Sequence, residues 1–283
     1  MDARLQRRVQ RYGWDKAASA YESGWRDQLA SAQCAMLDSV SWRPGQAVLD
    51  IACGTGLVTL QAAARVGPSG SVCGADISER MTSLARSAAD TKGFANTRFL
   101  RMDAEDLQFE ADGFDVALCA LGLMYLPDPE AALREMHRVV RPGGQAAATV
   151  WDQRNRCGWA DLFPIVDRRV QSEVCPMFFR LGTGDTLAMA FAEAGFTEVV
   201  SVRIDAPLRY ASADEACEAS FAGGPVALAY DRFGESIRRA VHGEYLASIA
   251  AFREGSEYSI PGEFVVSAGR KPNTLPSPQA ETS

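Results

Sequence analysis

The segment VLDIACGTGL, residues 48–57, joins an apolar run to a turn with two glycines and leads into the helical pattern of Leu57, Leu60 and Ala64. Glycine lets a ligand approach the backbone closely and adopts backbone angles that other residues avoid. A Gly-x-Gly turn between a strand and a helix therefore indicates a nucleotide site, although the turn alone is weak evidence. The dinucleotide-binding pattern has a third glycine three residues after the second, and this chain departs from it with Thr59.

Short apolar runs alternate with amphipathic stretches around this turn, which predicts βαβ units and a mainly parallel sheet. The helix after the fourth strand has the clearest signals, because Asp128 can cap it and Pro129 suits its first position. The expected strands are residues 47–51, 71–75, 97–100, 114–120, 145–151, 200–205 and 263–268. They form an α/β fold, a Rossmann-like seven-stranded and mostly parallel sheet with helices on both faces.

Composition restricts the partners and the compartment. The net charge of -7 argues against a nucleic-acid partner, because such binding depends on Lys and Arg side chains that neutralise phosphates. The seven cysteines are odd in number and widely spaced, and none forms a C-x-x-C pair, which indicates reduced thiols rather than disulfides or a zinc site. No run of about 18 apolar residues exists to span a membrane. We therefore expect a cytoplasmic monomer or homodimer.

Carboxylates follow the next two predicted strands. Asp76 comes 20 residues after Gly56, at the end of the second strand, where an acidic side chain can accept hydrogen bonds from ribose hydroxyls. Asp103 follows the third strand, within reach of an adenine amino group. Each carboxylate taken singly is also compatible with a solvated strand end. Together with the glycine turn they predict an adenosine site across three strand ends.

Five segments occur in order along the chain: VLDIACGTG, GADIS, RMDAEDLQF, FDVALCALGLMYLPD and REMHRVVRPGG. Over roughly residues 14–152 the chain resembles the class I S-adenosylmethionine methyltransferases, and among them the small-molecule enzymes similar to the ubiquinone/menaquinone C-methyltransferases. The resemblance implies S-adenosylmethionine as cofactor, S-adenosylhomocysteine as product and a small-molecule acceptor, with no metal. Several motifs in series are far more specific than any one of them.

The resemblance also implies roles for residues at the glycine turn and the second strand. By similarity, Gly54 and Gly56 would lie against the methionine portion of the cofactor. Asp76 would bind the ribose hydroxyls, and Ile77 and Met81 would flank the adenine. Met81 is equally compatible with a place in the core.

Further roles follow for residues nearby. By similarity, Asp103 and the backbone at Ala104 would recognise the adenine edge, and Cys119 would lie beside the methionine chain. Tyr21 would close over the site from the amino-terminal segment. Asp50 is expected to position the turn through hydrogen bonds rather than to bind the cofactor directly.

The same resemblance divides the chain. We expect a helical amino-terminal lid over residues 1–45 and the S-adenosylmethionine-binding core over 46–152. The remainder of the sheet is expected over 153–269, with a substrate-side helical insertion between strands six and seven at about 211–259. Residues 270–283 are rich in Pro, Ser and Thr, which predicts a disordered tail.

Methyl transfer from a sulfonium needs alignment and exclusion of water more than a nucleophilic side chain. An apolar, aromatic acceptor site is therefore expected, although ordinary packing explains each candidate equally well. The substrate candidates are Tyr125, Trp151, Phe179, Arg180, Phe221 and Tyr230.

A general base is needed if the acceptor must lose a proton. His242 is the better candidate, and Tyr21 and Asp152 are weaker ones. His137 is expected to be solvated, because it lies on the helix face opposite the apolar residues.

Two other functions remain open. An NAD(P)-dependent oxidoreductase shares the strand-turn-helix and the acidic second strand end, although Thr59 and the Asp103 motif speak against it. A catalytically silent S-adenosylmethionine-binding protein of the same fold is the second alternative. The acceptor is expected to be a partly apolar natural product or quinone-like ring, methylated on C, O or N.

Overall fold

The computed structural model describes residues 3–170, 175 and 177–273. Its main sheet has seven strands in the order β3-β2-β1-β4-β5-β10-β6, and only β10 runs antiparallel to its neighbours. This confirms the predicted Rossmann-like sheet. The strands are β1 (Ala47–Ile51), β2 (Ser71–Asp76), β3 (Thr97–Arg101), β4 (Phe114–Ala120), β5 (Val140–Trp151), β6 (Thr197–Asp205) and β10 (Glu263–Arg270).

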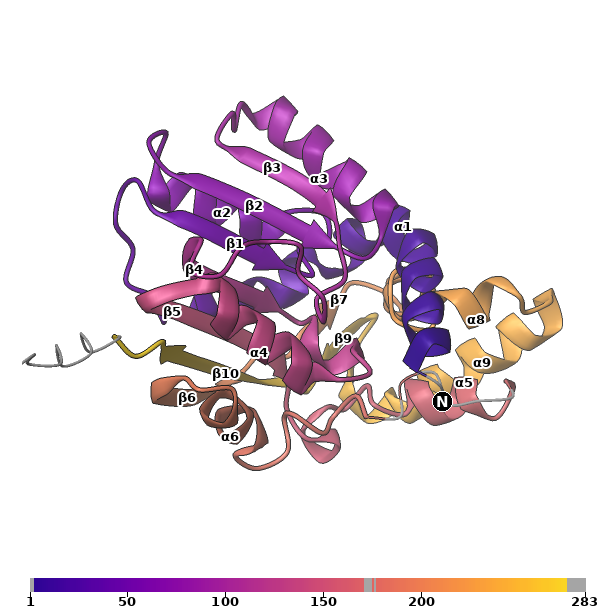
Figure 1. Ribbon diagram of the computed structural model, residues 1–283. Helices are drawn as coiled ribbons and strands as arrows, with labels where there is room; N and C mark the ends of the chain where they lie inside the picture. Colours follow the sequence, from indigo (N-terminus) through magenta and orange to yellow (C-terminus); the bar gives the residue numbers. More distant parts are fainter. Residues whose placement is uncertain (1–2, 171–174, 176, 274–283) are drawn as a thin grey trace, which may run out of the picture.

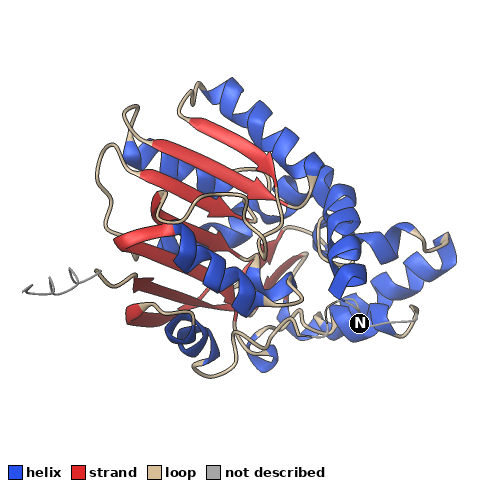
Figure 2. Ribbon diagram, viewed as in Figure 1, coloured by secondary structure: helices blue, strands red, loops and turns tan. Residues whose placement is uncertain are grey.

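Helices cover both faces of the sheet, because successive side chains of each strand point in opposite directions (Figure 2). Val48 of β1 packs in one cluster with Val58 of α2, whereas the next residue, Leu49, packs in another cluster with Leu133 of α4. The helices that follow strands are α2 (Leu57–Val66), α3 (Glu79–Lys92), α4 (Pro129–Val139), α5 (Leu162–Asp167) and α6 (Thr186–Glu193).

The ends of α4 show what the local sequence determines. Asp128 accepts a hydrogen bond from the Ala131 N–H at 2.8 Å, which confirms it as the cap before Pro129. After α4, β5 begins at Val140, five residues earlier than the prediction, and its register against β4 shifts between Phe114 and Val116. The Arg-Pro-Gly-Gly segment therefore ends the helix and also forms the irregular start of the strand.

The long helix α1 (Ala3–Asp38) lies across the end of the sheet toward which the parallel strands point (Figure 1). Its carboxyl-terminal half is buried through Trp25, Leu29 and Met36. Nearer its start, the Asp15 carboxylate accepts a hydrogen bond from the Ser78 hydroxyl at 2.6 Å, at the beginning of α3. The amino-terminal segment is therefore attached to the carboxyl ends of the strands.

An accessory lobe follows β6. The prediction of a helical insertion omitted a small sheet of order β7-β9-β8, which lies among the helices. The lobe contains β7 (Leu208–Tyr210), α7 (Ala213–Cys217), α8 (Ala227–Asp231), α9 (Glu235–Ser248), β8 (Arg253–Glu254) and β9 (Glu257–Ile260). Short helical turns over the whole fold are η1 (Leu123–Tyr125), η2 (Arg154–Arg156), η3 (Glu218–Ala222) and η4 (Ala250–Phe252).

Order extends into the predicted tail. Arg270 completes β10, and Lys271 accepts a hydrogen bond from the Gly143 N–H at 2.9 Å and donates one to the Gly144 carbonyl at 3.0 Å. Residues 274–283 of that predicted tail lie outside the described residues.

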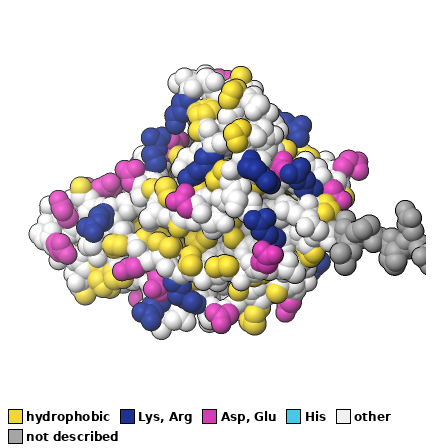
Figure 3. All heavy atoms as spheres, turned by 90° about the vertical axis from the view of Figure 1, so that its left-hand side faces the viewer, with side chains coloured by type: hydrophobic (Ala, Val, Ile, Leu, Met, Phe, Trp, Pro, Cys, Tyr) yellow, Lys and Arg dark blue, Asp and Glu magenta, His cyan; other side chains and the backbone are white. Residues whose placement is uncertain are grey.

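The distribution of charged side chains and the character of the helices bear on the expected partners. On the face drawn in Figure 3, basic and acidic side chains are interspersed rather than gathered by sign. None of the helices in the described part of the chain is long and apolar enough to cross a membrane.

Candidate active site

A pocket that is partly open to solvent lies at the carboxyl ends of the central strands, beneath α1. Among the predicted cofactor residues, those that line it are Tyr21, Gly54, Asp76, Ile77, Met81, Asp103 and Ala104. Residues that are distant in the sequence therefore meet at this edge of the sheet, because parallel strands end on the same side.

Asp76 connects the glycine turn to the second strand. Its two carboxylate oxygens accept hydrogen bonds from the Gly54 N–H and the Ser78 N–H, both at 2.9 Å. Burial raises the pKa of Asp76 to about 6, against the lowering effect of these two bonds. Each oxygen keeps a further lone pair, so the ionised side chain can accept additional hydrogen bonds from a ligand in the pocket.

Asp50 lies beneath the turn and does not line the main pocket. Its side chain is fully buried and accepts a hydrogen bond from the Thr59 hydroxyl at 2.5 Å. Its Oδ1 atom has no partner among the described residues, and burial raises the pKa of the carboxyl to about 7. Thr59, which stands where the dinucleotide pattern has its third glycine, thus anchors α2 to β1.

Two predicted cofactor residues, Gly56 and Cys119, are not among the residues that line the pocket. Gly56 has a φ of 86°, and a Cβ there would lie 3.1 Å from the Ala85 Cβ, so this glycine allows α3 to pack closely against the turn. Cys119 is fully buried, and the residues after it, Ala120 and Leu121, line the pocket instead.

Helix α1 contributes side chains that the sequence analysis did not identify. Arg7, Gln10 and Trp14 line the pocket beside Tyr21. The Arg7 Nε atom lies 3.1 Å from the Asp103 carboxylate, and the same guanidinium pairs with Glu105. Helix α1 carries many basic residues, and their spacing in the sequence does not indicate that Arg7 faces the strand ends.

A second, smaller cavity adjoins the first and shares Trp14, Tyr21, Leu121 and Tyr125 with it. We call it the aromatic cavity. Two of the predicted substrate residues, Tyr125 and Trp151, line it. Its other lining residues are Trp25, Leu29, Met124, Trp159, Leu162, Phe178, Gly224 and Pro225.

The other substrate candidates lie elsewhere. Phe179 is not among the lining residues of either cavity, and its ring packs against Phe178 with centroids 4.8 Å apart. Arg180 forms an ion pair with Glu130 at 2.6 Å. Its charge is therefore matched by a neighbour rather than directed at a cavity.

The remaining two candidates form a separate cluster with the predicted base in the accessory lobe. The Tyr230 hydroxyl and His242 Nε2 share a hydrogen bond of 2.9 Å, and the Phe221 ring lies 5.0 Å from the imidazole. None of the three lines the pocket or the aromatic cavity. The structure therefore does not bring His242 to the strand ends as a base.

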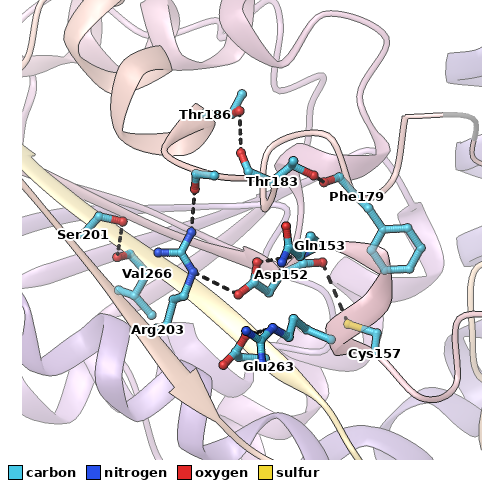
Figure 4. A network of polar contacts seen from close by, with 12 residues as sticks. Asp152, Gln153, Cys157, Phe179, Thr183, Thr186, Ser201, Arg203, Glu263 and Val266 are labelled. Atoms are coloured by element: carbon cyan, nitrogen blue, oxygen red, sulfur yellow. Dashed lines mark hydrogen bonds and ion pairs between the residues drawn. The ribbon is translucent and has the colours of Figure 1, made fainter.

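Asp152 does not line the pocket or the aromatic cavity. Its side chain is 1% exposed and pairs with Arg203, whose Nε lies 3.1 Å from the carboxylate (Figure 4). The Gln153 N–H donates to the same carboxylate at 2.6 Å. These contacts join β5 to β6, so Asp152 stabilises the sheet and is not placed as a base.

Tyr21 is the one base candidate that lines the site. Burial, with Asp76 and Asp50 nearby, raises the pKa of its phenol far above the usual value. The side chain is therefore a protonated hydrogen-bond donor at neutral pH rather than a base.

His137 corrects another prediction. It is half-buried rather than solvated, and its ring packs edge-on against Phe196 with centroids 5.0 Å apart. Within the described residues, no group of three or more His, Cys, Asp or Glu side chains is arranged to hold a metal.

The similarity of this sequence to known proteins lies mainly between β1 and the start of β5. Residues 48–144 match the family model described as a methyltransferase domain. A demethylmenaquinone methyltransferase of Listeria welshimeri is 37% identical over 119 residues, which cover 42% of this chain and 50% of that protein. The ubiquinone/menaquinone biosynthesis C-methyltransferase UbiE of Ectopseudomonas mendocina is 47% identical over 104 residues, which cover 36% of this chain and 41% of that protein. The matched region thus spans about half the length of these relatives.

Solved structures extend the likeness to most of the fold. Phosphoethanolamine N-methyltransferase 2 of Haemonchus contortus, in complex with S-adenosyl-L-methionine, has a TM-score of 0.59 at 17% identity, covering 92% of this chain and 57% of that one. The [4+2]-cyclase SpnF has a TM-score of 0.58 at 22% identity, covering 88% and 83%. At such identities the likeness shows the fold alone, and the activity has to be argued from the site.

Proposed function

We propose that this chain, which matches a methyltransferase domain over residues 48–144 and is similar there to ubiquinone/menaquinone C-methyltransferases, is a class I S-adenosylmethionine-dependent methyltransferase that transfers a methyl group to a small, partly apolar acceptor. The observation that carries the proposal is the pairing of a pocket at the strand ends with an adjoining cavity of aromatic side chains. In this proposal the pocket holds the nucleoside cofactor, and the aromatic side chains face the apolar acceptor.

The donor and acceptor groups of the pocket suit the cofactor. In this proposal, the free lone pairs of Asp76 accept hydrogen bonds from the ribose hydroxyls, and Asp103 meets the amino edge of the adenine. Ile77 and Met81 provide apolar contacts to its faces. At Gly54 the positive φ of 53° and the missing side chain leave room for the methionine portion beside the backbone.

Tyr21 and Tyr125 belong to both cavities, so in the proposed reaction they lie between cofactor and acceptor. When bound, S-adenosylmethionine supplies a methyl group already activated by its sulfonium. The protein has to align the acceptor with that carbon and to exclude water. The aromatic lining does both, and its ring faces attract a neighbouring cation.

No carboxylate or imidazole lines the aromatic cavity among the described residues. This favours an acceptor that is itself nucleophilic, such as a ring carbon activated by a hydroxyl group. The names of the similar proteins concern demethylmenaquinone and ubiquinone or menaquinone. The finer proposal is therefore C-methylation of a quinol-like ring, in which the ring carbon displaces the sulfur and the ring proton leaves to water.

A mass-shift assay tests the proposal. The protein is incubated with S-adenosylmethionine that carries a deuterated methyl group and with a panel of hydroquinones, naphthols and phenols. We expect a labelled product and an equal amount of S-adenosylhomocysteine. Cofactor binding with no labelled product from the whole panel would favour the catalytically silent alternative. Preferential binding of NADH would favour the oxidoreductase.

A further inference from the structure

We propose that the outer face of α1 binds the headgroups of an anionic lipid bilayer and so holds the pocket beside the membrane surface. The contact is made by exposed side chains of the first helical turns, Arg4, Leu5, Arg8 and Tyr12, which we call the outer stripe. The inference goes beyond the proposed function and does not depend on it, because a bilayer binds there without cofactor or acceptor.

The outer stripe is one continuous face of the helix. Arg8 follows Arg4 by four residues, and Leu5, Arg8 and Tyr12 follow one another at intervals of three and four. The opposite side of the same turns faces the protein, where Gln10 is buried and lines the pocket. A partner bound to the outer stripe therefore lies on one side of α1, and the pocket lies on the other.

The guanidinium groups of the outer stripe have no counter-charge. Residues 3–14 contain four arginines and no acidic residue, although the whole chain carries a net charge of -7. Arg7, on the pocket side, pairs with two carboxylates, whereas Arg4 and Arg8 form no ion pair with any described residue. Their positive charge is therefore available to an anionic partner, and the negative charge of the rest of the chain turns this face toward it.

Apolar side chains lie among these charges. Leu5 is 40% exposed and Tyr12 is 49% exposed. The Arg11 guanidinium lies 5.5 Å from the centre of the Tyr12 ring, which keeps that ring beside a positive charge. Arginines beside leucine and tyrosine on one helix face suit the interface of a bilayer, where cations meet phosphates and apolar groups enter the acyl boundary. A soluble polyanion offers no apolar layer to Leu5, so an anionic bilayer matches both parts of the stripe.

The outer stripe and the pocket share the same helical turns. Arg7, Gln10 and Trp14 line the pocket from these turns. The bilayer is therefore separated from the pocket by the diameter of one helix, about 10–12 Å. Under the proposed function, an acceptor that partitions into the bilayer is thereby concentrated near the pocket.

Co-sedimentation of the full chain with vesicles tests the proposal. One set of vesicles contains phosphatidylglycerol and phosphatidylcholine in equal amounts, and the other contains phosphatidylcholine alone. Each arginine near an anionic surface strengthens binding by about 5-fold. We therefore expect Arg4→Gln/Arg8→Gln to bind the anionic vesicles about 25-fold more weakly than the wild type. The matched control Arg232→Gln/Arg239→Gln removes two exposed arginines of the accessory lobe, with the same change in net charge, and should bind nearly as tightly as the wild type.

Two further measurements separate the charge contact from the apolar one. Raising the NaCl concentration from about 0.1 to 0.5 M should weaken binding of the wild type itself, which tests the charge contact without a substitution. Leu5→Gln should weaken vesicle binding by about 2- to 10-fold, because an apolar side chain leaves the acyl boundary. An unchanged affinity in Leu5→Gln would overturn the proposal in favour of a soluble anionic partner.

Three other results would overturn the proposal: equal binding to both kinds of vesicle, binding to neither, or an unchanged affinity in Arg4→Gln/Arg8→Gln. Calorimetry with S-adenosylhomocysteine on the same variants shows whether the pocket is intact. Because vesicle binding is measured without cofactor, its failure is distinguished from failure of the proposed function.

Discussion

Replacing Asp76 by Asn removes the charge that holds both the glycine turn and, in the proposed complex, the ribose. Asp76 accepts two backbone hydrogen bonds of 2.9 Å, from Gly54 and Ser78. The amide has one accepting oxygen, so its nitrogen faces one of these N–H donors and repels it. Hydrogen bonds to charged groups contribute about 1.5–3 kcal/mol each. We therefore expect the affinity for S-adenosylhomocysteine to fall by roughly 10- to 100-fold, about 1.4–2.8 kcal/mol.

Isothermal titration calorimetry at pH 8 measures this change, because the wild-type carboxyl, whose pKa is about 6, is ionised there. The wild-type affinity should decline as the pH falls through 6, whereas the affinity of Asp76→Asn should not follow that decline. Glu79→Gln is the matched control, since Glu79 is exposed at the start of α3 and does not line the pocket. A folded Asp76→Asn protein with unchanged affinity would refute the ribose assignment.

Three further predictions concern the glycine turn and helix α1. Burial raises the pKa of Asp50 to about 7, so between about pH 4 and 7 the folded state binds more protons than the unfolded state, and the free energy of unfolding falls as the pH rises. Urea denaturation at pH 5 and pH 8 should show a smaller fall in this free energy for Asp50→Asn than for the wild type. An equal fall in both proteins would contradict burial of Asp50 as the cause. Gly56→Ala should lose about 1–3 kcal/mol of stability, because its φ is 86° and its Cβ would lie 3.1 Å from Ala85. Thermal denaturation measures this loss of stability. The control Gly67→Ala, with a φ of 69° and open space around it, should lose less stability, and equal losses would count against close packing of Gly56 on α3. Arg7→Met should speed S-adenosylhomocysteine dissociation by about 2- to 5-fold in stopped-flow experiments, since partly exposed ion pairs contribute about 0–1 kcal/mol. An unchanged rate would mean that the ion pairs of Arg7 do not hold α1 over the pocket.

The parts of the site that were predictable are those that depend on local sequence. Asp76 and Asp103 could be placed because each directly follows an apolar run, and parallel strands end on one side. Gly56 and Cys119 were assigned by similarity, but which face of the turn or strand they present depends on packing with α3 and β5. Trp159 lies in an irregular segment, where no periodicity indicates its direction.

Contacts between distant elements account for the other differences. The helical pattern of α4 places His137 opposite its apolar face, and only the fold reveals that Phe196 covers it. Asp152 resembles a free carboxylate at a strand end until β6 brings Arg203 to it (Figure 4). Such pairings join residues far apart in the sequence, so no local pattern predicts them.

A crystal structure of the protein with S-adenosylhomocysteine is the most direct test of the central claim. The account predicts the ribose hydroxyls on Asp76, the adenine against Ile77 and Met81 with its amino edge at Asp103, and the sulfur directed toward Tyr21 and the aromatic cavity. A pocket that stays empty at saturating ligand, or an adenosine bound elsewhere on the chain, would contradict it.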